Sequence, residues 1–215
     1  MSGPRLFAAL AALAALVAAV GLAYVPTPLT PGDPFARHML RHMLLVAVIA
    51  PLLVVVLPTP KRPIPDATVL AATVAEFVVV WGWHLPLLHD LAQVATAVFL
   101  LEQASFLAVG YWLWRSALQT GSELAAVGAL LLTSMHMTLL GALLVLAAEP
   151  LYHAHGEHVA TLAGQQIGGV LMLGIGTPVY LVVALARLRR ALGPAPGGDA
   201  ARVRTNPPLA LRGER

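Results

Sequence analysis

Long apolar runs separated by short polar or proline-rich segments dominate the sequence. Each run is apolar on all sides, whereas membrane-spanning strands alternate apolar and polar residues, so the pattern predicts membrane-spanning helices. A span needs about 20 apolar residues. Stretches that reach or nearly reach this length are Leu6–Tyr24, His38–Leu57, Ala67–Leu85, Leu91–Trp114, Leu124–Ala147 and Thr161–Ala186. We therefore expect an all-α, polytopic transmembrane bundle of about six spans over residues 1–192.

The composition supports this class. The chain is 59% hydrophobic and 11% charged, whereas an ordinary soluble domain is about 25% charged. It contains no cysteine, so a metal site must use His, Met, carboxylate or backbone ligands. Residues 193–215 are poor in bulky apolar side chains and are expected to form a disordered cytoplasmic tail. The net charge of +3 is interpreted as a topology signal, and no nucleic-acid partner is expected.

The first two runs carry further signals. The first ends in Gly21-Leu22-Ala23, which a signal peptidase could cleave, but the run is long for a signal core, so we favour a retained helix over Leu6–Tyr24. Pro51 lies inside the second run and removes one backbone donor. We expect a kink there that frees a carbonyl within the bundle.

Basic residues predict the orientation of the spans. Lysine and arginine collect on the cytoplasmic side of membrane helices. They occur at alternate ends of successive runs, as Arg5, Lys61, Arg62, Arg115, Arg187, Arg189 and Arg190. Six spans with both termini in the cytoplasm place all of these inside, and Arg37 and Arg41 are the exceptions.

The histidines gather at the opposite ends of the runs. His38 and His42 open the second run, and His84 closes the third. On a helix, positions four apart share a face, so His38 lies over His42 and Met39 over Met43. Imidazole and thioether groups together suit a soft or borderline metal ion, copper above all. This pattern predicts a copper site at the outer face.

Three ionisable residues, Glu76, Glu102 and His136, lie near the middle of the predicted spans. Such groups are costly in a bilayer unless paired or hydrated, so they are functional candidates by default. Counted from the helix ends they lie at similar depth, which allows a shared site. Met137 follows His136 and is a further candidate metal ligand. Hydrogen bonding between helices is the alternative role for these polar side chains.

The segment after the fifth run contains His153, His155 and His158, with Glu157 between them. In an extended chain, residues two apart point to the same side, so His153 and His155 form a ligand-like pair. We interpret the three histidines as candidate collecting ligands for copper. A hydrated loop that merely tolerates histidine is the alternative.

Five short motifs follow one another along the chain. They are His38-Met39-x-x-His42, Trp83-His84-Leu85-Pro86, Glu102 with Tyr111-Trp112-x-Trp114, His136-Met137-x-x-Leu140-Gly141-Ala142-Leu143 leading to Pro150-Leu151-Tyr152, and Gln165-Gln166-x-Gly168-Gly169. In this order they resemble the CtaG family of cytochrome c oxidase assembly factors, over roughly residues 37–180. The chain departs from the usual family pattern at Gln103, Gly164 and Leu173, where the family often has a histidine, an acid and a tryptophan.

The resemblance implies a non-enzymatic role in maturing a copper-containing cytochrome c oxidase in the bacterial plasma membrane. It implies copper as the metal and oxidase subunits as partners; a homo-oligomer stays open. Two alternatives come from the residues. Transmembrane histidines can ligate haem, which would make the chain an electron-transfer subunit. Glu76, Glu102 and His136 would suit a proton-coupled transporter, although the two halves lack the internal similarity that inverted repeats predict.

Overall fold

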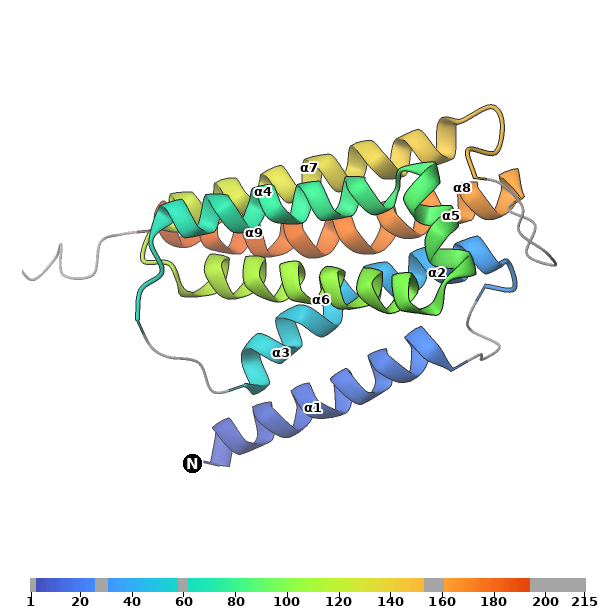
Figure 1. The fold of residues 1–215 in the computed structure, drawn as a ribbon. Coiled ribbons are helices and arrows are strands. Elements are labelled where there is room, and N and C mark those ends of the chain that lie inside the picture. Colours follow the sequence, from blue (N-terminus) through green and yellow to red (C-terminus); the bar gives the residue numbers. More distant parts are fainter. Residues whose placement is uncertain (1–2, 26–30, 58–61, 153–160, 194–215) are drawn as a thin grey trace, which may run out of the picture.

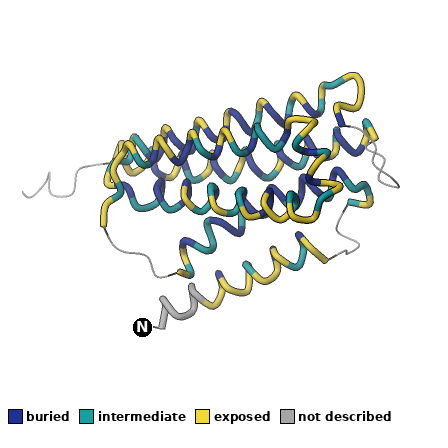
Figure 2. Tube along the Cα trace, viewed as in Figure 1, coloured by how far each residue is buried: buried dark blue, intermediate teal, exposed yellow. Residues whose placement is uncertain are grey.

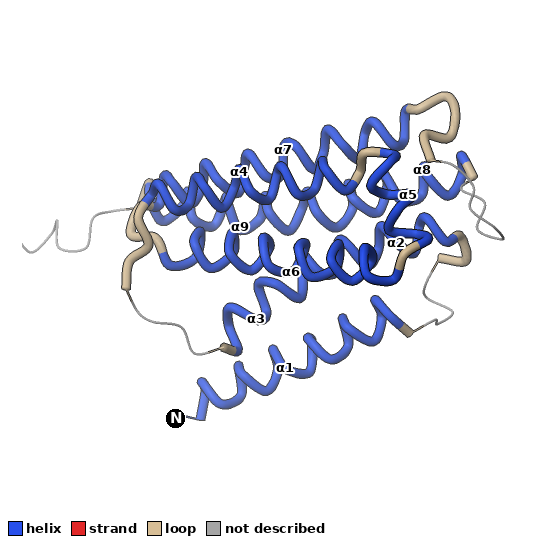
Figure 3. The backbone as a smooth tube through the Cα atoms, in the orientation of Figure 1, coloured by secondary structure: helices blue, strands red, loops and turns tan. Residues whose placement is uncertain are grey.

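The computed structural model describes residues 3–25, 31–57, 62–152 and 161–193, and helices account for most of these residues (Figures 1 and 3). The elements are α1 (Gly3–Tyr24), α2 (Pro34–Met43), the π-helix η1 (Leu44–Ile49), α3 (Ala50–Val56), α4 (Asp66–Trp83), α5 (Pro86–Val94), α6 (Thr96–Gln119), α7 (Glu123–Leu146), α8 (Leu162–Leu171), the π-helix η2 (Met172–Gly176) and α9 (Thr177–Ala191). Within the described residues, five helical stretches are long and apolar enough to cross a membrane, and Leu10–Tyr24 is a shorter apolar helix. The predicted polytopic helical bundle is confirmed.

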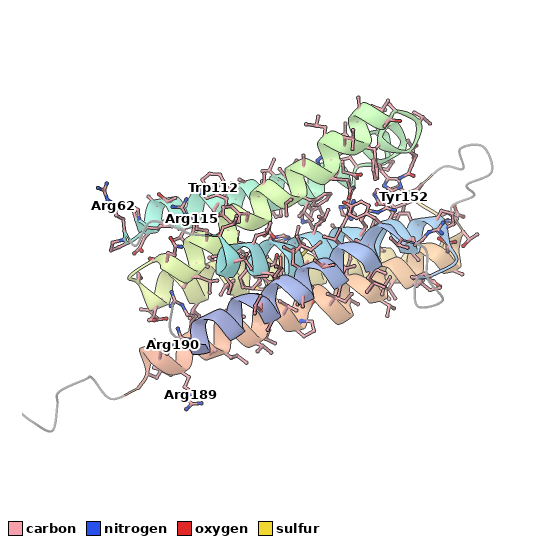
Figure 4. All side chains as sticks on the ribbon, turned by 90° about the horizontal axis from the view of Figure 1, so that it is seen from below. Arg62, Trp112, Arg115, Tyr152, Arg189 and Arg190 are labelled. Atoms are coloured by element: carbon pink, nitrogen blue, oxygen red, sulfur yellow. The ribbon has the colours of Figure 1, made fainter. Side chains whose placement is uncertain are left out.

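The two ends of the bundle differ in their side chains. The start of α1 and the end of α9 lie at the same end (Figure 1). Arg62, Arg115, Arg189 and Arg190 lie at this end, and Tyr152 lies at the opposite one (Figure 4). We call the first the basic end, and the other, which carries α2 and α5, the histidine end. The six spans expected from the sequence require the two helix termini to share one end, as they do here.

Arg41, one of the exceptions to the basic pattern, is held by α1 and α6. Its Nε donates a hydrogen bond to the carbonyl of Ala23 at 3.2 Å. Its guanidinium lies 5.3 Å from the ring centroids of both Tyr24 and Phe99. The hydrogen bond and the two cation–π contacts account for the position of the Arg41 side chain. It therefore carries little information about membrane orientation.

The fourth span begins later than the sequence predicts. We expected one helix over Leu91–Trp114, but the chain forms the short helix α5, turns at Ala95 and only then begins α6. Ala95 has extended φ and ψ angles of −123° and 110°. No proline or glycine marks this position, so the local sequence carries no helix-ending signal. The break lets α5 pack against α6 and bury His89 against Tyr152, with ring centroids 4.4 Å apart.

The second span changes its hydrogen-bond register just before Pro51. Residues Leu44–Ile49 form the π-helix η1, a wider turn of the kind often found at functional sites. The carbonyl of Val46 in this turn accepts a hydrogen bond from Nε1 of Trp114 at 2.7 Å, and the hydroxyl of Tyr180 lies 3.2 Å from the same oxygen. A backbone acceptor within the bundle therefore ties η1 to α6 and α9.

Close backbone contacts hold α8 against α2 and α7. A Cβ added at Gly168 would meet Cγ of Met39 at 2.7 Å, and one added at Gly169 would meet the carbonyl oxygen of Gly141 at 2.6 Å. Small residues are what permit such approaches between membrane helices.

By contrast, α1 carries exposed residues along much of its length, whereas the other helices turn buried positions toward the interior (Figure 2).

Candidate metal centre

Two histidines of α2 and one carboxylate of α6 converge at the histidine end. Nε2 of His38 lies 3.2 Å from Oε1 of Glu102, and Nε2 of His42 lies 3.4 Å from the same oxygen. One potential ligand atom from each residue lies within 4.8 Å of the others. The two histidines share a face because they are one helical turn apart. Glu102 comes opposite them because α6 packs against η1, which continues α2.

The spacing of these atoms suits a shared cation. Two ligands held tetrahedrally at about 2.1 Å from one ion lie roughly 3.4 Å apart, and the two nitrogen–oxygen distances are 3.2 and 3.4 Å. All three side chains are buried. A buried carboxylate is costly without a compensating charge, which a bound cation would supply. The group of His38, His42 and Glu102 could therefore hold a metal ion.

Gln103 connects this group to α1. Its Nε2 donates to Oε2 of Glu102 at 3.1 Å and lies 3.5 Å from Nε2 of His42. Its Oε1 accepts a hydrogen bond from the hydroxyl of Tyr24 at 3.1 Å. This arrangement occupies Oε2 of Glu102 and leaves Oε1 facing the histidines.

The side chains of His84 and Met39 form a second pair of potential metal ligands beside the group. Nε2 of His84 lies 3.4 Å from Sδ of Met39, and its Nδ1 lies 2.6 Å from the carbonyl of Val80. The carbonyl contact requires a proton on Nδ1, which leaves a lone pair on Nε2 facing the thioether. The rings of His42 and His84 have centroids 5.9 Å apart. An imidazole and a thioether, both favoured by Cu(I), thus lie next to the first group.

An aromatic cluster of Phe35, His89 and Tyr152, here called the aromatic cap, lies beside His38. The centroid of the His89 ring is 4.9 Å from that of His38 and 5.3 Å from that of Phe35. The hydroxyl of Tyr152 donates to the carbonyl of His84 at 3.1 Å. Burial, followed by the nearby histidines, lowers the pKa of His89 to about 2. Its ring is therefore neutral at physiological pH.

His136 pairs with a different carboxylate. Its Nε2 lies 3.5 Å from Oε2 of Glu76, and the hydroxyl of Tyr180 donates to Oε1 of Glu76 at 2.9 Å. Similar depth allowed one site for Glu76, Glu102 and His136, but the structure forms two groups. Glu102 belongs with the histidines of α2, and Glu76 belongs with His136. Two groups form because residues at the same depth in the membrane can face different neighbouring helices.

A family model described as cytochrome c oxidase caa3 assembly factor (Caa3_CtaG) matches residues 2–193, most of the chain. The chain belongs to this family. The resemblance drawn from the five motifs is therefore confirmed, and this assembly factor is a multi-pass membrane protein. Comparisons with curated proteins and with solved structures gave no match.

The remaining predicted ligands of this assembly factor are Met137, His153, His155 and His158. Met137 is fully buried in the hydrophobic core. His153, His155 and His158 lie outside the described residues, and their role as collecting ligands stays a prediction.

Two polar residues that contact the candidate ligands were not predicted as part of a site. The motifs mark Gln103 as a departure from the family pattern, and they do not include the side chain of Tyr180. Each is a polar side chain within an apolar run that is buried in the structure, which is the signal that would have indicated them.

Proposed function

We propose that this assembly factor binds a copper ion through His38, His42 and Glu102 and delivers it during the assembly of cytochrome c oxidase. The observation that carries the proposal is the convergence of two imidazole nitrogens on one buried carboxylate oxygen, at 3.2 and 3.4 Å. The role is non-enzymatic, because the ion is cargo and the residues bind and release it without forming or breaking a covalent bond in a substrate.

Copper is the ion that the donors favour. The chain has no thiols, and the imidazole of His84 and the thioether of Met39 lie beside the three-residue group. Such donors select copper over harder ions such as magnesium. The mixture of a carboxylate with imidazole and thioether groups allows the ion to exchange between neighbouring positions, as delivery requires.

The position of the group fits delivery at the outer face of the bacterial plasma membrane. The basic residues lie at the opposite end of the bundle (Figure 4), and basic residues favour the cytoplasm. The group then lies toward the extracytoplasmic end of the bundle, where the segment with His153, His155 and His158 would collect copper. The partner on this side would be a subunit of the oxidase.

The test is the copper content of the purified full-length protein after loading with Cu(I) and removal of free metal. We expect His42→Ala and His84→Ala to bind less copper than the unchanged protein. Met135→Ala is the control, because the Met135 side chain is 68% exposed, whereas the proposed ligands are buried. Unchanged copper binding in both histidine variants would overturn the proposal, and a Soret band in the purified protein would favour haem instead.

A further inference from the structure

The proposed copper site leaves one buried pair of ionisable residues unused. Glu76 of α4 is fully buried and His136 of α7 is 5% exposed. Oε2 of Glu76 and Nε2 of His136 are 3.5 Å apart. Both lie near the middle of helices long enough to span a membrane, where an ionisable side chain is a candidate for function.

The facing atoms of this pair have unused hydrogen-bonding capacity. Oε2 of Glu76 and both ring nitrogens of His136 make no hydrogen bond with any residue that the structure describes, and the same holds for Oγ1 of Thr133. Thr133 lies three residues before His136 on α7, so the two share a face. Buried polar atoms are normally paired, and each exception calls for a partner such as an ion or water.

The surroundings orient the pair. Tyr180 donates to Oε1 of Glu76 at 2.9 Å, which leaves Oε2 facing His136. The same hydroxyl lies 3.2 Å from the carbonyl of Val46, and the Tyr180 ring stacks on Trp114 with centroids 4.9 Å apart. Groups that hold the second oxygen of a carboxylate in this way are typical of the surroundings of metal ligands.

We propose that Glu76 and His136 form a second metal site, specific for a borderline divalent cation such as Cu(II) or Zn(II) and separate from the copper site of His38, His42 and Glu102. The 3.5 Å between the two atoms matches the spacing of roughly 3.4 Å between ligands of one tetrahedral ion. A charge-assisted hydrogen bond would bring them to about 2.8 Å. The thioether of Met39, which favours Cu(I), lies beside the copper site, whereas the nitrogen and oxygen donors of the Glu76–His136 pair suit a borderline divalent ion.

The test counts divalent ions bound by the full-length protein in detergent, with Zn(II) and Cu(II) as separate probes and elemental analysis as the readout. The doubly substituted His38→Ala, His42→Ala protein, in a background in which His153, His155 and His158 are also alanine, is expected to retain one equivalent. Adding His136→Gln or Glu76→Gln to it should remove that equivalent, and Met135→Ala is the matched control on the exposed face of α7. The Cu(II) electron paramagnetic resonance spectrum of the retained ion should show a single imidazole nitrogen.

The outcomes separate this site from the copper site. Loss of all divalent metal from the folded His38→Ala, His42→Ala protein would overturn the second site, and that measurement needs no change at Glu76 or His136. The second site would also be overturned if the retained metal ion stayed bound after His136→Gln and after Glu76→Gln. Unchanged Cu(I) binding in His42→Ala and His84→Ala would instead overturn the copper site and leave the second site standing.

Discussion

Nε2 of His38 lies 3.2 Å from Oε1 of Glu102, which joins two residues 64 positions apart in the sequence. Both side chains are buried. A second imidazole, from His42, approaches the same oxygen at 3.4 Å. Polar side chains from two apolar spans thus meet in one polar centre. The copper proposal rests on this contact.

Glu102→Gln is expected to weaken Cu(I) binding at least about tenfold, because the amide keeps the shape of the side chain but removes the charge that offsets the cation. Competition with a chromogenic Cu(I) chelator measures the affinity. The control is Glu123→Gln, which removes a carboxylate 3.0 Å from Arg187, a residue near the C-terminal end of α9. Equal losses of affinity in the two variants would contradict the assignment of Glu102 as a ligand.

Gln103→His is expected to tighten Cu(I) binding by about tenfold, equivalent to roughly 1.4 kcal/mol. The reason is that Nε2 of Gln103 already lies 3.5 Å from Nε2 of His42, so a third imidazole would reach the group. The same chelator competition measures it. Gln166→His is the control, because Gln166 contacts the carbonyl of Val145 instead. An unchanged or weaker affinity in Gln103→His would count against the proposed position of the ion.

Gly169→Ala is expected to destabilise the fold by about 1–3 kcal/mol, because its Cβ would lie 2.6 Å from the carbonyl oxygen of Gly141 and force α7 and α8 apart. The apparent melting temperature in detergent should fall by several degrees. Gly174→Ala is the matched control, since a Cβ there meets nothing within 4 Å. Similar melting temperatures for the two variants would show that close α7–α8 packing contributes little.

Tyr152→Phe is expected to lower stability at neutral pH by about 1 kcal/mol, because it removes the hydrogen bond to the carbonyl of His84. Burial, and then the charge of Asp90, raise the pKa of Tyr152 above its ordinary value of 10.0. Above that pH the unfolded tyrosine loses its proton while the folded one keeps it, so the stabilisation declines as pH rises.

The difference in stability between Tyr152→Phe and the unchanged protein should therefore shrink when thermal unfolding is measured at about pH 11 instead of pH 7. A difference that stays constant or grows over this range would show that the Tyr152 hydroxyl is not protected from ionisation in the folded state.

The sequence alone determined the features that depend on spacing along one helix. Apolar runs long enough for a bilayer predicted the helical spans, because hydrophobicity and helix length are local properties. The four-residue spacing of His38 and His42 placed both on one face. The alternation of arginine-rich and histidine-rich ends separated the candidate metal centre from the basic end before any contact between helices was known.

Only the tertiary structure decided which groups meet. Residue count fixed the depth of Glu76, Glu102 and His136, but the order in which helices surround the core assigned Glu102 to α2 and Glu76 to His136. The break in the helix at Ala95 also has no local sequence signal. It is stabilised by a tertiary contact, the burial of His89 in the aromatic cap. Distance along a helix axis follows from the chain itself, whereas lateral neighbours depend on how all the helices pack together.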